Sequence, residues 1–176
     1  MLTGLACLSL LSTMPSSAQT QADEYRIKAG FIFHFAQFVE WPAGTFTNSA
    51  GSITFCTLGE DPFHGDMESL LRGKLVAGKS VRVLHLKQVQ DSKQCNVLFL
   101  DKNDDQLVPS ALATVENLPI LTVGESDDFL ERGGMIRFCM EDRRIRFEVN
   151  QQAAEATHLK VSARLLLLAK KVIASH

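Results

Sequence analysis

Hydrophobic and polar residues alternate with a period of two along two neighbouring runs near the C-terminal end of the chain. The first run covers residues 135–140 and the second covers residues 145–149, with the polar tetrad 141–144 between them. Successive side chains of a β-strand point to opposite faces of the sheet, so this period is typical of half-buried strands. The pattern therefore predicts a β-hairpin at 133–150.

The side chains of this hairpin also predict its register. When Glu141 faces Arg144, every residue on one face is apolar, and Arg137 faces Glu148 on the other. A shift of one residue would place isoleucine and phenylalanine opposite arginine and glutamate, which a strand with one buried face does not tolerate. We therefore expect this register, with the apolar face in the core.

The rest of the chain alternates between helical patterns and short apolar strands. Polar residues 19–24 are expected to be frayed, and Asp61 followed by Pro62 is a typical start for a helix. The pattern predicts a largely buried helix at 25–39, strands at 53–58, 81–86, 96–100 and 119–123, helices at 62–71 and 109–117, a short helix up to Ala156, and a final amphipathic helix that begins after Ser162 and includes Val172.

Strands joined by helical crossovers form mainly parallel sheets. We therefore expect a single α/β domain. Its sheet should be mixed and mostly parallel, with about six strands, helices on both faces, and the antiparallel hairpin as the closing edge.

The first 18 residues contain no charged side chain, and the apolar part at 2–14 has the length of a signal-peptide core. Small residues precede a cleavage point after Ala18. The alternative interpretation is a disordered or core-packed N-terminus. We expect export to the periplasm, removal of the leader together with Cys7, and one mature domain at 19–176.

Composition argues against two further classes of function. The net charge is −2, whereas nucleic-acid-binding domains usually carry a basic excess. No segment after residue 18 has the roughly 18 consecutive apolar residues that a membrane span needs. Nucleic acid is therefore not an expected partner.

Three cysteines remain in the mature chain, namely Cys56, Cys95 and Cys139. In an oxidising compartment an unpaired thiol is unusual, and three cysteines allow one bridge and one free thiol. Cys56 lies within a predicted strand and Cys95 at the start of a later one, and right-handed crossovers can make those strands neighbours. We favour a Cys56–Cys95 bridge over two buried free thiols.

No catalytic, nucleotide-binding or metal-ligand motif appears in the sequence, so we expect no enzyme, no cofactor and no metal. The loop LGEDPFHG at 58–65 follows the first strand of the predicted sheet. Open α/β sheets usually bind ligands at such a position. Glu60 and His64 are therefore the candidate ligand-binding residues, and with Asp61 they form a conceivable metal or acid–base cluster.

Charge is concentrated on the hairpin, at Arg137, Arg143, Arg144, Arg146 and Glu148. Because acidic residues are interleaved with the arginines, the simplest interpretation is a solvated face that compensates its own charge. The sharper hypothesis is a surface at the edge of the sheet on which a partner docks.

Five segments, taken together and in order, resemble the YfiR-like family of small periplasmic proteins. They are KAGFIFHFAQFVEWP (28–42), ITFCTLGEDPFHG (53–65), LPILTVGE (118–125), GGMIRFCMEDRRIRFEVN (133–150) and LKVSARLLLLA (159–169). The resemblance implies a mixed sheet flanked by helices, often in a dimer, and a regulator rather than an enzyme. The best-understood member represses a membrane-bound diguanylate cyclase by binding its periplasmic sensor domain, and an outer-membrane lipoprotein sequesters it.

The resemblance also bears on single residues. Cys56 and Cys95 stand at the positions of the family's bridge. Cys139 matches a second family cysteine, but Arg132 stands about where its partner is expected, so we expect Cys139 to be a free thiol. Arg143 stands where many relatives have asparagine, which suits the turn better.

Our leading hypothesis is a periplasmic regulator that docks on the sensor domain of an inner-membrane diguanylate cyclase or histidine kinase. An outer-membrane lipoprotein and a second copy of the chain are further expected partners. The alternative is a periplasmic small-molecule-binding or enzyme domain that uses the loop Gly59–Gly65.

Overall fold

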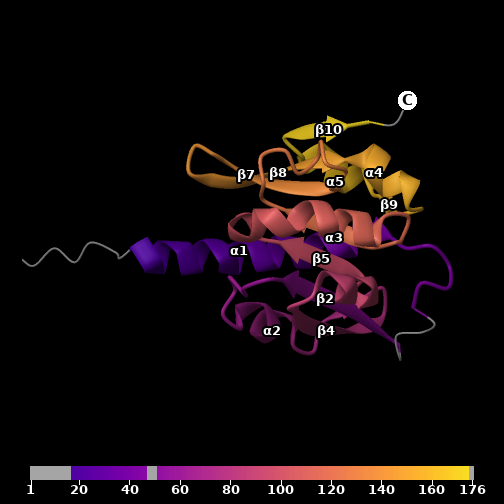
Figure 1. The fold of residues 1–176 in the computed structure, drawn as a ribbon, viewed down its shortest axis with the longest axis horizontal. Helices are drawn as coiled ribbons and strands as arrows, with labels where there is room; N and C mark the ends of the chain where they lie inside the picture. The colour runs from indigo at the N-terminus through magenta and orange to yellow at the C-terminus, as the bar shows by residue number, and fades with distance from the viewer. Residues whose placement is uncertain (1–16, 47–50, 175–176) are drawn as a thin grey trace, which may run out of the picture.

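The computed structural model describes residues 17–46 and 51–174, so most of the expected signal peptide lies outside the described residues. Helix α1 (Ser17–Gln37) begins well before the predicted start at Tyr25. Residues 19–24, which we expected to be frayed, belong to this helix and are mostly exposed. Figure 1 shows its first turns extending beyond the body of the domain. Alanine, glutamine and glutamate favour helix, which explains why the helix continues through this polar stretch.

One eight-stranded sheet organises the described part of the chain. In spatial order its strands are β10 (Lys171–Ile173), β8 (Arg144–Asn150), β7 (Ile136–Glu141), β6 (Leu121–Gly124), β5 (Val97–Leu100), β2 (Ser52–Leu58), β4 (Lys79–Leu86) and β3 (Leu75–Val76). The run from β4 through β7 is parallel throughout. The mixed, mostly parallel sheet is confirmed, although it is larger than the expected six strands. β1 (Val39–Glu40) and β9 (Lys160–Val161) form a separate antiparallel pair.

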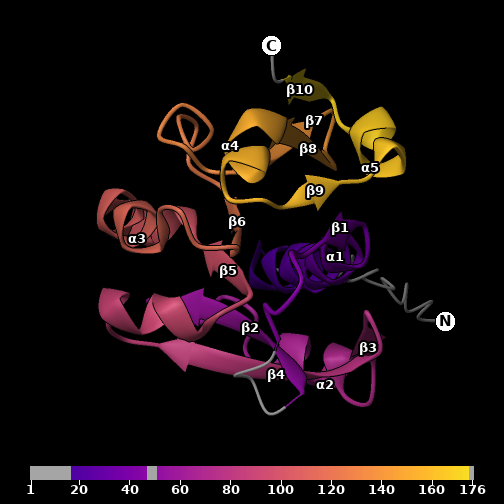
Figure 2. The same ribbon diagram turned by 90° about the vertical axis from the view of Figure 1, so that its right-hand side faces the viewer.

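The sheet separates two hydrophobic cores. Helices α1 and α2 (Asp66–Leu71) contribute to one core, and α3 (Val108–Val115) with the 3-10 turn η1 (Val89–Gln94) contributes to the other. Figure 2 shows α1 and α3 on opposite sides of β5 and β6. Alternate residues of β5 enter the two cores, Phe99 the first and Leu98 the second. Helices on both faces are therefore confirmed.

Two short helical segments follow strands directly. α4 (Gln151–Ala156) begins after Asn150, whose Oδ1 accepts a hydrogen bond from the Ala153 amide at 3.0 Å, as the sequence predicts. The 3-10 segment η2 (Lys102–Leu107) follows β5 and is capped by Asp101.

The helix predicted at 62–71 begins only at Asp66. The Asp61 side chain accepts hydrogen bonds from the amides of Phe63 (3.0 Å) and Gly65 (3.3 Å), so it caps a separate turn. His64 (φ 49°) and Gly65 (φ 87°) have left-handed backbones, which a continuous helix cannot contain. These two residues divide the turn from α2.

The prediction for the C-terminal helix is wrong in its second half. α5 (Ala163–Leu168) begins as predicted, because Ser162 Oγ accepts a hydrogen bond from the Leu165 amide at 3.3 Å. The helix then stops, and the chain continues into β10, where Val172 is paired in parallel with Val149. A β-branched residue favours such an extended end. Because β10 covers part of β8, the hairpin is not the closing edge of the sheet.

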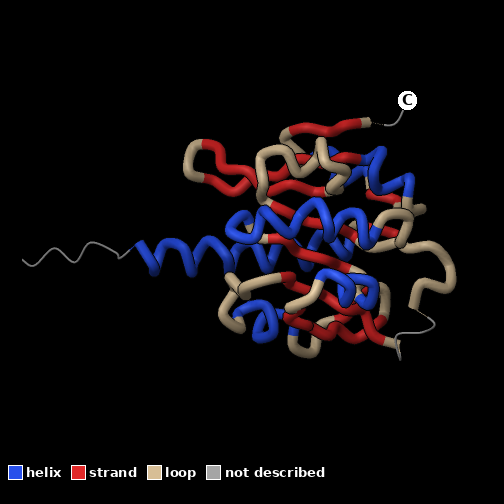
Figure 3. Tube along the Cα trace, in the orientation of Figure 1, coloured by secondary structure: helices blue, strands red, loops and turns tan. Residues whose placement is uncertain are grey.

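The register predicted for the hairpin is confirmed at every pair from Ile136–Val149 to Glu141–Arg144. Its apolar face is buried near the sheet, where Phe138 is 3 % exposed, but Met140 is 53 % exposed. The expectation that this whole face belongs to the core is therefore wrong at the outer end. Figure 3 shows why: the strands and their turn extend past the body of the domain.

Arg143 occupies a strained position in the hairpin turn. Asp142 (φ 48°) and Arg143 (φ 60°) are both left-handed, as in a two-residue turn that favours Asn-Gly. We expect Arg143→Gly to raise the free energy of unfolding by about 0.5–1 kcal/mol, because relief of strain exceeds the entropy cost of glycine. Urea denaturation measures this. Arg144→Gly, placed in a strand, should instead destabilise, and equal effects of the two substitutions would contradict this account.

Candidate docking site

Arg137 and Glu148 form a structural ion pair within the hairpin. Arg137 Nε lies 3.2 Å from Glu148 Oε2. Arg137 Nη1 donates hydrogen bonds to the carboxylate (2.8 Å) and to the backbone carbonyl (2.9 Å) of Asp127. Only 15 % of the Arg137 side chain and 12 % of the Glu148 side chain are exposed. These contacts tie β7 to β8 and to the loop before β7, so little of either side chain is available to a partner.

Arg143, Arg144 and Arg146 are exposed at the outer end of the hairpin. β10 pairs with β8 only at residues 148–150, so the outer edge of β8 has no strand beside it among the described residues. Arg146 lies 3.8 Å from Glu141, whose pKa is lowered by its hydrogen bond to Lys170. We call Met140, Arg143, Arg144 and Arg146 the hairpin tip.

Apolar side chains extend from the core toward the hairpin tip. The ring centroids of Phe31 and Phe138 are 6.1 Å apart where α1 packs on the hairpin. Ile27 lies one helical turn before Phe31, and Met140 lies two residues beyond Phe138 on the same face of the strand. Ile27 is 54 % exposed and Met140 is 53 % exposed. Each of the two elements thus carries an exposed apolar side chain beyond the Phe31–Phe138 contact, and exposed apolar surface often marks an interaction site.

Cys139 lies half-buried on β7, beside a cleft of about 400 Å³ that Lys28, Lys102 and Lys170 also line. Burial, with a smaller contribution from the Glu148 carboxylate, raises the pKa of its thiol. A thiolate is the reactive form of cysteine, so this environment does not activate it. The environment therefore favours an inert, partly buried thiol over a reactive one.

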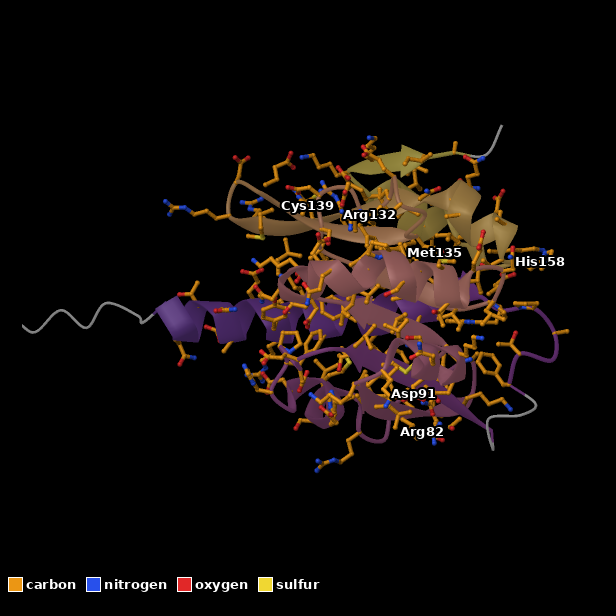
Figure 4. All side chains as sticks on the ribbon, in the orientation of Figure 1. Arg82, Asp91, Arg132, Met135, Cys139 and His158 are labelled. Atoms are coloured by element: carbon orange, nitrogen blue, oxygen red, sulfur yellow. A yellow bond between two sulfur atoms is a disulfide. The ribbon has the colours of Figure 1, made fainter. Side chains whose placement is uncertain are left out.

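Arg132 stands in the loop before β7, where a partner for Cys139 was expected, and Figure 4 labels both residues. Its guanidinium pairs with Asp128 (2.6 Å) and Asp105 (3.2 Å). An ion-pair cluster thus occupies this loop, and Cys139 is a free cysteine.

Cys56 and Cys95 form a disulfide, with their Cα atoms 5.9 Å apart. Cys56 lies in the middle of β2 and Cys95 just before β5, and these two strands are neighbours in the sheet. The bridge favoured from the sequence is therefore confirmed. It links the first strand of the sheet to the second core, in which both cysteines are buried.

We expect the denatured, unreduced mature protein to contain one thiol that can be labelled, on Cys139. Maleimide labelling followed by mass spectrometry counts such thiols. Cys139→Ser should abolish labelling, and the native wild type should be labelled slowly because its thiol is partly buried. Three labelled thiols in the wild type would contradict the bridge.

A buried polar network fixes α1 to the carboxyl ends of β5 and β6. Lys28 Nζ contacts the carboxylates of both Glu24 and Glu125. The Tyr25 hydroxyl lies 3.0 Å from Asp101 Oδ1 and 3.0 Å from Glu125 Oε2. Lys28, Tyr25 and Asp101 are each 3 % exposed or less.

The network shifts the pKa values of its own groups. Burial raises the pKa of Glu125, and the positive charge of Lys28 acts in the opposite direction. Burial and the neighbouring carboxylates raise the pKa of Tyr25, so the hydroxyl keeps its proton.

This network was not predicted from the sequence, although the chain carries a signal for it. An acidic residue follows each of two wholly buried strands, Asp101 after β5 and Glu125 after β6. Parallel neighbouring strands end at the same edge, so these two carboxylates had to lie close together. Lys28, one of two cationic residues at the start of the predicted helix beside Tyr25, was an available counter-charge.

Glu60 and His64, the candidate ligand residues, are both exposed beside a cleft of about 230 Å³. The Glu60 amide donates to Asp104 Oδ2 at 3.0 Å, and a Cβ added to Gly59 would come within 2.1 Å of the same carboxylate. A protein carboxylate therefore occupies the place over this turn where an anionic ligand would bind. The Asp61 carboxylate forms a group of possible metal ligands with Glu68 and His85, and this group does not include Glu60 or His64.

No helix of the described residues is long and apolar enough to span a membrane. A search of curated proteins found no match to the chain. Among solved structures, the chain is similar to a conserved domain protein from Vibrio cholerae, with a TM-score of 0.55, 10 % identity, and coverage of 82 % of this chain and 59 % of that one.

It is also similar to an ABC domain from Streptococcus pneumoniae that was solved in complex with L-Trp. The TM-score is 0.52 at 11 % identity, with coverage of 71 % of this chain and 56 % of that one. This chain spans less than two thirds of either structure, and at such identities the likeness concerns the fold alone.

The profile of the YfiR/HmsC-like family matches residues 25–170, which hold every strand of the sheet except β10, the buried residues of both cores, and the disulfide. Proteins of this family are known as periplasmic regulators of diguanylate cyclases rather than as catalysts. The chain belongs to the YfiR/HmsC-like family.

Proposed function

We propose that this protein is a periplasmic signalling regulator that docks on the sensor domain of an inner-membrane diguanylate cyclase and represses cyclic-di-GMP synthesis. Membership of the YfiR/HmsC-like family is the observation that carries the proposal. A histidine kinase with a periplasmic sensor domain is the second candidate for the docked protein. Sequestration by an outer-membrane lipoprotein and pairing with a second copy of the chain belong to the same proposal.

We place the docking surface at the hairpin tip. Met140 offers an exposed apolar anchor on one face of the hairpin, and Arg144 and Arg146 lie on the opposite face. Arginine and methionine are both enriched at protein interfaces. The uncovered outer edge of β8 can also accept a strand from another chain. Three exposed arginines would favour a sensor domain with an acidic surface, because complementary charge directs association.

Binding of the purified sensor domain to the mature protein, measured by biolayer interferometry, tests this placement. We expect Arg144→Glu with Arg146→Glu to weaken binding at least about tenfold, through repulsion of the acidic surface. Arg72→Glu changes an exposed arginine just after α2 and should leave binding unchanged. Equal binding by the wild type and the hairpin double variant would contradict the placement.

The cleft beside Glu60 and His64 supports a second candidate function, the binding of a small molecule at the carboxyl ends of β2 and β5. The same measurement separates the two functions. Glu60→Ala and His64→Ala should leave binding of the sensor domain unchanged if the hairpin tip is the functional surface.

A further inference from the structure

Three side chains that can ligate a metal converge near the ends of β2 and β4. Asp61 comes from the loop after β2, Glu68 from α2 and His85 from β4. One ligand atom of each lies within 4.8 Å of the others. The side chains are between 21 % and 35 % exposed, and His85 lies at the surface, so the group is reachable from solvent.

The His85 ring is oriented by its neighbour on the adjacent strand. Thr57 is paired with His85 in the sheet, is 1 % exposed, and places its Oγ1 2.7 Å from His85 Nδ1. The other ring nitrogen, Nε2, is directed at the Glu68 carboxylate. A hydrogen bond at the second nitrogen is what usually fixes the ring and the tautomer of a metal-binding histidine.

One oxygen of Glu68 is left unsatisfied by the protein. Oε1 contacts His85, whereas Oε2 is buried and has no hydrogen-bond partner among the described residues. The contact with His85 uses Oε1 alone and leaves Oε2 buried without a partner, which is unfavourable. A cation bound by both oxygens of this carboxylate would satisfy Oε2 as well. The orphaned atom thus favours a bound cation over a simple ion pair.

We propose that Asp61, Glu68 and His85 bind one zinc ion. A set of one imidazole nitrogen and carboxylate oxygens suits zinc, which takes such ligands at about 2.0–2.2 Å. Calcium and magnesium prefer oxygen ligands alone. Three protein ligands leave a fourth position for water. The ion joins α2 and the loop after β2 to the sheet, far along the sheet from the hairpin tip.

Isothermal titration calorimetry of the untagged, chelator-treated mature protein with zinc chloride tests the site. We expect one zinc per chain. Glu68→Gln and His85→Gln should each weaken binding at least about tenfold, the size of effect that loss of a ligand or its support produces. His34→Gln, which changes an exposed histidine on α1 outside the group, should leave the affinity unchanged. Circular dichroism confirms the fold of each variant, and Glu68→Asp replaces any variant that does not fold.

The visible absorption of bound cobalt(II) gives a second readout, and its bands should change in Glu68→Gln and in His85→Gln. Zinc affinity that survives both substitutions would overturn the proposal. So would loss of binding in His34→Gln, or no binding up to on the order of 1 mM zinc, where affinity is negligible. A preference for calcium or magnesium over zinc would overturn the assignment of the ion. These outcomes are independent of whether a cyclase is the protein's partner.

Discussion

Replacement of both Cys56 and Cys95 by alanine is expected to lower the free energy of unfolding by about 4 kcal/mol. The two residues are 39 positions apart in the sequence. In the chain-entropy description, a cross-link that closes a loop of this length restricts the unfolded chain and so raises its free energy. Domains of this size are usually stable by only about 5–15 kcal/mol, so the loss is a large fraction of the total.

Urea denaturation of the double variant and of the reduced wild type measures this contribution. Reduction opens the bridge without removing any buried atom, so it separates loss of the cross-link from loss of packing around the two buried sulfur atoms. Cys139→Ser is the matched control, because it removes the free thiol, and it should change stability by less than about 0.5 kcal/mol. A reduced wild type as stable as the oxidised protein would contradict the assigned role of the bridge.

Lys28→Met should destabilise the protein by about 3–5 kcal/mol near pH 8, the range observed when one partner of a buried ion pair is removed. Methionine fills a similar volume, so the effect comes from charge rather than from a cavity. Lys28 is 3 % exposed, and without it the buried carboxylate of Glu125 loses its cation. The exposed Lys102 lines the same cleft, and Lys102→Met should cost less than about 0.5 kcal/mol.

The loss in Lys28→Met should shrink as the pH falls. The folded-state pKa of Glu125 is raised, so this group stabilises the fold below its unfolded pKa, and that contribution is lost as pH rises through the folded pKa. Removal of Lys28 raises the folded pKa further, and Glu125 therefore becomes neutral at a higher pH. Urea denaturation at pH 8 and at pH 5.5 should show the smaller deficit at pH 5.5. Addition of Glu125→Gln should restore part of the loss at pH 8, and a deficit that grows on acidification would contradict this account.

The hairpin was predictable in detail because two constraints agreed. Its period of two defined the strands, and the apolar face together with the Arg137–Glu148 pair allowed only one register. The predicted start of the helix at Pro62 was wrong. Capping by Asp61 could be recognised from the sequence, but the left-handed backbone of His64 and Gly65 could not. A local capping signal does not reveal how far the helix continues.

The candidate sites were harder to predict, because they depend on partners far apart in the sequence. Arg137 and Glu148 were correctly placed opposite one another, but only the structure shows how little of either side chain is exposed. The exposure of Met140 follows from the length by which the hairpin exceeds the sheet, which periodicity does not contain. The link between Lys28 and Glu125 joins residues from α1 and from the end of β6, and no local pattern connects them.

In the proposed function, this protein represses cyclic-di-GMP synthesis by docking through the hairpin tip. The intracellular concentration of cyclic-di-GMP in cells that lack the gene, supplied with either the wild type or the Arg144→Glu, Arg146→Glu variant, tests it most directly. We predict a raised concentration without the protein, a return to the normal level with the wild type, and a persistently raised level with the variant at equal periplasmic abundance. A concentration that is unchanged by loss of the protein would contradict the repressor function, and full restoration by the variant would contradict the docking surface.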